Sequence, residues 1–259
     1  MAILAVVVMT GFATAAGFCV VVSPRLGMAG VMAVLALLIA QGLHVSAHDA
    51  VRALLLAVTG GMLQAAVSLA ASFTDNARER VRLARGLRDA RDACARSLTF
   101  ESHAFRHALR WGVALGAAVA IYRFIDLQGH GYWIPLTVVF VLRPEVDDTL
   151  ERMAMRAAGT LLGLALATAI AETLGYHVVP TAIILTISAA CAYALVAIEY
   201  AAFTIAITVY IVLLSDALGE RALHAVGQRA LATAIGIAIA ALAITVWPNE
   251  PNRVRNGPD

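Results

Sequence analysis

Residues 110–163 read RWGVALGAAVAIYRFIDLQGHGYWIPLTVVFVLRPEVDDTLERMAMRAAGTLLG and hold two apolar segments and the start of a third. The segments are separated by Gly129-His130-Gly131 and Arg143-Pro144-Glu145, which have the glycine, proline and charged residues typical of turns. Their apolar runs are continuous and do not alternate with polar residues, so they favour helices over the strands of a membrane barrel. This stretch predicts an all-α membrane protein.

The same pattern extends to both sides of this stretch. Hydrophobic residues make up 61% of the 259-residue chain and charged residues 14%, against about 45–50% and 25% in soluble domains. This composition excludes a soluble enzyme, a nucleic-acid binder and a disordered protein. At about 20 residues for each span, we predict a polytopic transmembrane helical bundle of about nine spans, three plus a six-helix unit. The segments are Met1–Val22, Gly27–Leu43, Val51–Phe73, Trp111–Phe124, Tyr132–Leu142, Ala157–Leu174, Val178–Val196, Ala201–Leu218 and Ala230–Trp247.

A long charged stretch divides the chain into four predicted parts. They are three transmembrane helices at 1–73, a cytoplasmic amphipathic helical linker at 74–110, a six-helix membrane domain at 111–248 and a cytoplasmic tail at 249–259. His48 and Gly60 are twelve residues apart, and His224 and Gly236 have the same spacing. This repeated spacing favours the interpretation that residues 1–73 are the remnant of a first six-helix repeat. The alternative is chance similarity in a sequence rich in alanine, leucine and glycine.

The arginines predict the orientation of the spans. All nineteen basic residues are arginine. If the linker is cytoplasmic and each segment crosses once, fifteen arginines lie on the cytoplasmic side and four on the other. The four are Arg52, Arg123, Arg221 and Arg229. Because cytoplasmic loops are enriched in positive charge, we predict an external N-terminus and a cytoplasmic C-terminus.

The segment Tyr132–Leu142 is too short for a regular span. Its eleven residues would cover about 16 Å as a helix, roughly half of a 30 Å hydrocarbon core. Short or interrupted helices in transporters place polar backbone near the bilayer midplane, where substrates bind. A tilted helix lengthened by polar residues at both ends is the alternative, and the sequence leaves both open.

Candidate substrate-path residues lie on this segment and after it. Three arginines follow it where the chain turns at the cytoplasmic side, and arginine suits bidentate contact with carboxylates. They could instead extend to lipid headgroups, and the two threonines could satisfy helix carbonyls. The candidates are Tyr132, Trp133, Thr137, Arg143, Arg152, Arg156 and Thr160. Two GxxxG pairs predict close helix packing, namely Gly112 with Gly116 and Gly159 with Gly163.

Four motifs in this region resemble the integral-membrane domain of the fusaric acid resistance family. They are His130-Gly-Tyr-Trp133-x-Pro-Leu-Thr137, Val-Leu-Arg143-Pro144, Thr149-Leu-x-Arg152 and Arg156-x-x-Gly159-Thr160-x-x-Gly163. The similarity covers roughly residues 105–247. That family includes aromatic acid exporters, and plant aluminium-activated malate channels are distant relatives. The resemblance implies a multipass transporter of the bacterial inner membrane that exports small organic acids, aromatic acids among them, without ATP hydrolysis of its own.

Two other classes of function compete with transport. A membrane enzyme is not expected, because the sequence has no HExxH, GxSxG, GxGD or Walker A motif. We predict no metal or cofactor, since the three cysteines lie far apart. A non-transporting membrane scaffold or accessory subunit is the alternative function. The expected partners are the lipid bilayer, a small organic anion, and a second copy of the chain or accessory efflux subunits, but not nucleic acid.

Overall fold

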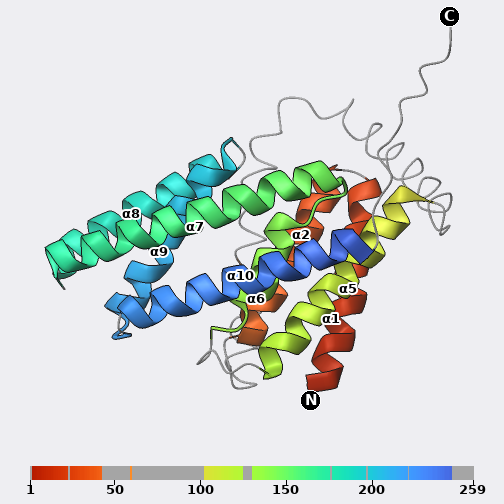
Figure 1. Cartoon of the computed structure of the whole chain (residues 1–259), viewed down its shortest axis with the longest axis horizontal. Helices are drawn as coiled ribbons and strands as arrows, with labels where there is room; N and C mark the ends of the chain where they lie inside the picture. The colour runs from red at the N-terminus through yellow and green to blue at the C-terminus, as the bar shows by residue number, and fades with distance from the viewer. Residues whose placement is uncertain are drawn as a thin grey trace, which may run out of the picture. The chain divides into compact units, whose positions relative to one another are not determined.

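Helices account for every regular element of the described chain (Figure 1). The computed structural model describes residues 2–22, 24–42, 59, 102–124, 130–175, 177–196, 198–220 and 222–246. The helices are α1 (Ala2–Val22), α2 (Pro24–Gly42), α5 (His103–Phe124), α6 (Trp133–Val141), α7 (Val146–Leu174), α8 (Val178–Leu195), α9 (Tyr200–Ala217) and α10 (Ala222–Val246). The predicted all-α class is confirmed. The predicted third span and the helix of the linker at 76–97 lie outside the described residues, so the count of nine spans stays a prediction.

Four helices of the described part are long and apolar enough to cross a membrane, judged by length and composition. Their apolar windows are Val146–Thr173, Val178–Leu195, Tyr200–Ala217 and Leu223–Val246. Shorter apolar windows lie in α1 and α2, at Ile3–Phe18 and Gly30–Ile39. The described part of the chain is therefore that of a multipass helical membrane protein.

Three helices begin well before the spans predicted from hydropathy. Helices α5, α7 and α10 begin at His103, Val146 and Ala222, whereas the predicted spans begin at Trp111, Ala157 and Ala230. The reason is visible in α7, where Asp147 and Asp148 occupy the first turn and interact favourably with the helix dipole. Apolar content predicts the part of a helix that suits hydrocarbon, but the helix itself continues through polar residues.

The chain divides into two compact units, Gly11–Gly112 and Met1–Thr10 with Val113–Asp259. In the unit Gly11–Gly112, α1 packs closely on both α2 and α5. A Cβ atom on Gly17 would lie 3.0 Å from the Cα of Ala108, and the rings of Phe18 and Phe105 are 5.7 Å apart between centroids. Small residues thus allow backbone contact between these helices.

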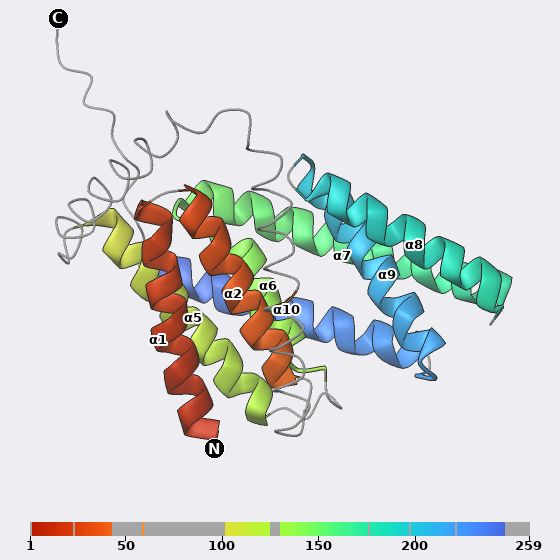
Figure 2. The ribbon, with the colours of Figure 1, turned by 180° about the vertical axis from the view of Figure 1, so that it is seen from behind.

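The other unit contains α6 to α10. Helix α9 packs extensively on α7 and on α8, and the three lie side by side in both views (Figures 1 and 2). Helix α10 packs against α6 and α7 and less extensively against α9. An apolar core between α7 and α9 is formed by Leu164, Ala167, Val209, Val212 and Leu213.

Helix α6 is short and lies inside its unit. It has nine residues, seven of them buried, and covers about 14 Å. At Leu142 the backbone becomes extended, so the helix ends before Arg143 instead of continuing through polar residues at that end. The short helix predicted from Tyr132–Leu142 is therefore confirmed, with one residue fewer at each end. Because α7 and α10 pack on it, α6 brings their polar side chains together.

Candidate functional site

One face of α7 carries a stripe of predicted site residues. Arg152, Arg156, Thr160 and Gly163 follow one another at steps of four, four and three, which places them on one side of a helix. Arg156 is ten residues from the first residue of α7, about 15 Å along the axis. Its side chain is 1% exposed, so it is buried among the helices.

The Arg156 guanidinium is buried, and no described carboxylate forms an ion pair with it. Its Cζ lies 5.9 Å from the centroid of the Phe140 ring, within the range of a cation–π contact. Atoms Nε and Nη1 have no hydrogen-bond partner among the described residues. Burying a charge without such partners is costly, and an ionisable group within a spanning helix is by default a candidate for function.

Arg229 on α10 joins this site, although the sequence analysis placed it at an external helix end. The guanidinium is 2% exposed, its Cζ lies 5.1 Å from the Trp133 ring centroid, and its Nε has no partner in the described part of the chain. Arg156 and Arg229 each lie beside an aromatic ring of α6. Because Trp133 and Phe140 are seven residues apart on α6, about two helical turns, both arginines lie along the same face of that helix.

The predicted residues of α6 and the threonine of α7 differ in their surroundings. Trp133 is 2% exposed and Tyr132 is half-buried. The Thr137 hydroxyl donates a hydrogen bond to the Trp133 carbonyl oxygen at 3.0 Å, so it satisfies a helix carbonyl, as the alternative interpretation held. The Thr160 hydroxyl is buried and has no hydrogen-bond partner among the described residues, so that alternative is wrong for Thr160.

Arg143 and Arg152 lie where α6 turns into α7. The backbone N–H of Arg143 donates to the Thr149 hydroxyl at 3.0 Å, and that hydroxyl lies 2.8 Å from the Glu145 carbonyl oxygen, which fixes the turn. Burial lowers the pKa of the Arg143 guanidinium, and the nearby positive charge of Arg152 acts in the same direction. The Cζ of Arg152 lies 4.3 Å from the ring centroid of Tyr200, a buried residue absent from the predicted set.

Both glycines of the second GxxxG pair contact α9. A Cβ atom on Gly159 would lie 2.8 Å from the Thr204 Cβ, and one on Gly163 would lie 2.7 Å from the Thr208 Cβ. In the first pair, Gly116 meets the side chain of Thr10, while Gly112 is buried. A further close contact, missed by the sequence analysis, joins Gly236 of α10 to Thr137 of α6: a Cβ on this glycine would lie 2.6 Å from the Thr137 Cβ.

A sequence signal for Arg229 does exist. Residues 156–163 read RAAGTLLG and residues 229–236 read RALATAIG, so both follow the pattern R-A-x-x-T-x-x-G. The two copies lie on α7 and α10. In each copy the arginine and threonine are buried and the final glycine contacts a threonine of a neighbouring helix. This shared pattern marks Arg229 as the counterpart of Arg156.

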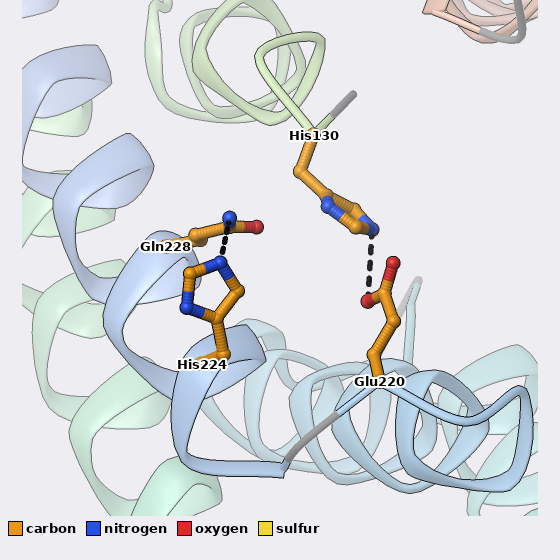
Figure 3. Close-up of polar contacts among 4 residues, drawn as sticks. All are labelled: His130, Glu220, His224 and Gln228. Atoms are coloured by element: carbon orange, nitrogen blue, oxygen red, sulfur yellow. Dashed lines mark hydrogen bonds and ion pairs between the residues drawn. The ribbon is translucent and has the colours of Figure 1, made fainter. Parts of the chain in front are cut away.

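One polar contact connects the segment before α6 with the segment after α9, and a second lies within the first turns of α10 (Figure 3). The His130 Nε2 lies 3.4 Å from the Glu220 Oε2, an ion pair when the imidazole is protonated. On α10, the Gln228 Nε2 and His224 Nε2 are 2.8 Å apart. The His130 ring also lies 4.4 Å from the Trp133 ring, measured between centroids. This polar layer is adjacent to Arg229 along α10.

Together these helices and the buried arginines on them define a polytopic α-helical membrane protein with a cationic interior. The chain belongs to the fusaric acid resistance protein-like family, whose pattern matches residues 112–243.

Two relatives are much longer than this chain. The inner membrane protein YccS of Escherichia coli K12 is 34% identical over 169 residues, which cover 63% of this chain and 23% of the relative. An uncharacterized protein of Haemophilus influenzae is 31% identical over 156 residues, or 58% of this chain and 21% of the relative. The match thus spans less than a quarter of either relative. No solved structure matches the chain.

Proposed function

We propose that this chain is a multipass transporter of the bacterial inner membrane that exports small organic acids, aromatic acids among them. Membership of the fusaric acid resistance protein-like family supports this function, and the relative from Escherichia coli is named an inner membrane protein. The observation that carries the proposal is Arg156, a buried cation on a membrane-spanning helix with N–H groups that lack acceptors among the described residues. A transported anion supplies those acceptors.

The proposed path begins at the turn between α6 and α7. Arg143 and Arg152 attract the anion from the cytoplasm, since clustered positive charge raises the local concentration of anions. Arg156 lies one turn beyond Arg152 on the same face of α7 and receives the carboxylate in the helix interior. No Walker A motif is present in the sequence, so the energy comes from an ion gradient or from the gradient of the acid itself. The six-helix domain at 111–248 carries the path in this proposal.

Substituting the arginines tests this function. Arg143→Ala and Arg156→Ala are each expected to lower the apparent affinity for an exported aromatic acid by about 10- to 150-fold, the loss of one charge-assisted bidentate contact. Arg143→Lys is expected to recover only part, because lysine keeps the charge but lacks the planar fork. The measurement is resistance to the acid in cells with matched protein levels. Arg123→Ala, at the exposed end of α5, is the control. Full resistance with both site variants would leave these arginines as topology signals only.

The proposed orientation has an external N-terminus and a cytoplasmic C-terminus. Reporter fusions at Ser97 and after Asp259 are expected to report the cytoplasm, and a fusion at Gly129 the external side. The reason is the excess of arginines in the predicted cytoplasmic segments. If Ser97 and Gly129 report the same side, α5 does not cross and the six-helix domain is wrong.

A further inference from the structure

The two R-A-x-x-T-x-x-G segments place two buried cations inside the bundle, and the described part of the chain has no buried carboxylate. Arg156 and Arg229 are both at most 2% exposed. None of the aspartates and glutamates in the described ranges is buried, so no described carboxylate balances this charge within the bundle. Two like charges buried in one helical unit also disfavour each other. An anion between them would remove both penalties.

Thr160 and Thr233 add hydroxyl groups on the same two faces. Each follows its arginine by four residues, so it lies one turn further along the same helix face. Thr137, Thr168 and Thr204 each donate a hydrogen bond to the carbonyl oxygen four residues before them. This is the usual hydrogen bond of a threonine hydroxyl in a membrane helix. The hydroxyls of Thr160 and Thr233 are buried but have no hydrogen-bond partner in the described part.

We propose that Arg156, Thr160, Arg229 and Thr233 form one carboxylate-binding site between α7 and α10, in which both guanidinium groups share a single carboxylate. The assignment rests on the proposed function, because it makes the carboxylate that of the transported acid. Helices α7 and α10 pack on each other and on α6, and the arginine of each lies beside a ring of α6. The planar guanidinium donates two parallel hydrogen bonds to a carboxylate, and two guanidinium groups together satisfy both oxygens.

Helix α6 explains why an organic acid suits this site better than an inorganic anion. The rings of Trp133 and Phe140 lie against the two guanidinium groups, with Cζ-to-centroid distances of 5.1 and 5.9 Å. They therefore offer apolar surface directly beside the charged groups. A carboxylate bound to the arginines would place the apolar body of its acid against these rings.

Binding of benzoate to the purified full chain in lipid nanodiscs tests the site. We expect wild type to bind one radiolabelled benzoate per chain, with no competition from benzamide, which has the same shape without the charge. Arg156→Gln and Arg229→Gln are each expected to weaken binding at that one site by about tenfold or more. Arg123→Gln, which removes an arginine from the exposed end of α5, is the matched control and should leave binding unchanged.

The threonines provide a second test that barely changes side-chain volume. Thr160→Val and Thr233→Val are each expected to weaken benzoate binding by about two- to tenfold, the effect of losing a neutral hydrogen bond. Thr168→Val, also on α7, is the control, because its hydroxyl already donates to the Leu164 carbonyl oxygen. These variants keep the test valid if an arginine variant does not fold.

Three results would overturn the shared site: no saturable benzoate binding to wild type, two benzoates per chain with each arginine variant losing one, or unchanged binding in Arg229→Gln. Transport in proteoliposomes separates this proposal from the proposed function. If wild type binds benzoate through both arginines but does not transport it, the site stands and the function fails. If Arg229→Gln transports benzoate with an unchanged KM, the function stands and the shared site fails.

Discussion

Gly159→Leu is expected to remove most of the folded protein. A Cβ atom alone would lie 2.8 Å from the Thr204 Cβ and 2.9 Å from the Ala201 carbonyl oxygen, and the backbone oxygen cannot move without shifting α9. Leucine adds three further carbon atoms at this contact. Overpacking of a close contact typically costs about 1–3 kcal/mol or more, and this one lies in the extensive interface between α7 and α9.

The measurement is the yield of monodisperse protein after extraction into detergent, together with its Tm. Gly227→Leu on α10 is the matched control, because a Cβ atom at Gly227 meets no atom within 4 Å. We expect this control to retain wild-type yield, since leucine favours a helix more than glycine does. If Gly159→Leu is recovered normally but no longer exports the acid, the glycine lines the substrate path and packing is not its main role.

Much of the fold could be predicted because membrane helices are coded by local composition. The apolar run at Val178–Val196 predicted α8 to within one residue, and the short run before Arg143-Pro144 predicted α6. The ends of these two helices depend on turn residues that lie next to them in the sequence, so a short stretch of sequence is enough to predict them. The start of α10 was missed because His224, Gln228 and Arg229 made its first turns resemble a connecting segment. Hydropathy describes transfer into lipid, whereas the buried guanidinium of Arg229 packs against Trp133 of α6.

The candidate site was predictable only along one stretch of chain. Arg156 and Thr160 were identified because they follow the short helix within one motif. Arg229 is 73 positions further along the sequence, and its contact with Trp133 depends on how α10 packs on α6. The close approach of Gly236 to Thr137 sets that packing. A glycine predicts that close contact is allowed, but it does not identify the helix that makes the contact.

Arg156→Met is expected to raise the stability of the ligand-free protein while it abolishes export. The wild-type guanidinium is 1% exposed and lacks hydrogen-bond partners for Nε and Nη1 among the described residues, so the folded state carries an uncompensated desolvation cost. Methionine has a similar length, a flexible apolar side chain and an equal helix propensity.

Two terms set the size of this effect. Replacing buried charged groups with apolar residues of similar volume can stabilise a protein by about 1–4 kcal/mol. The lost contact with the Phe140 ring, 5.9 Å from the Arg156 Cζ, offsets about 0.5–1 kcal/mol of that gain. We therefore expect a higher Tm in thermal unfolding of the ligand-free protein in detergent.

Arg123→Met serves as the control for this stability measurement. Arg123 is exposed at the end of α5, so its replacement should change Tm little. A fall in Tm for Arg156→Met would mean that the guanidinium stabilises the ligand-free bundle. That result would contradict the inference that an anion is its missing partner. A rise in Tm with loss of export would instead show that this arginine is kept at the expense of stability, as expected of a residue whose partner is the transported acid.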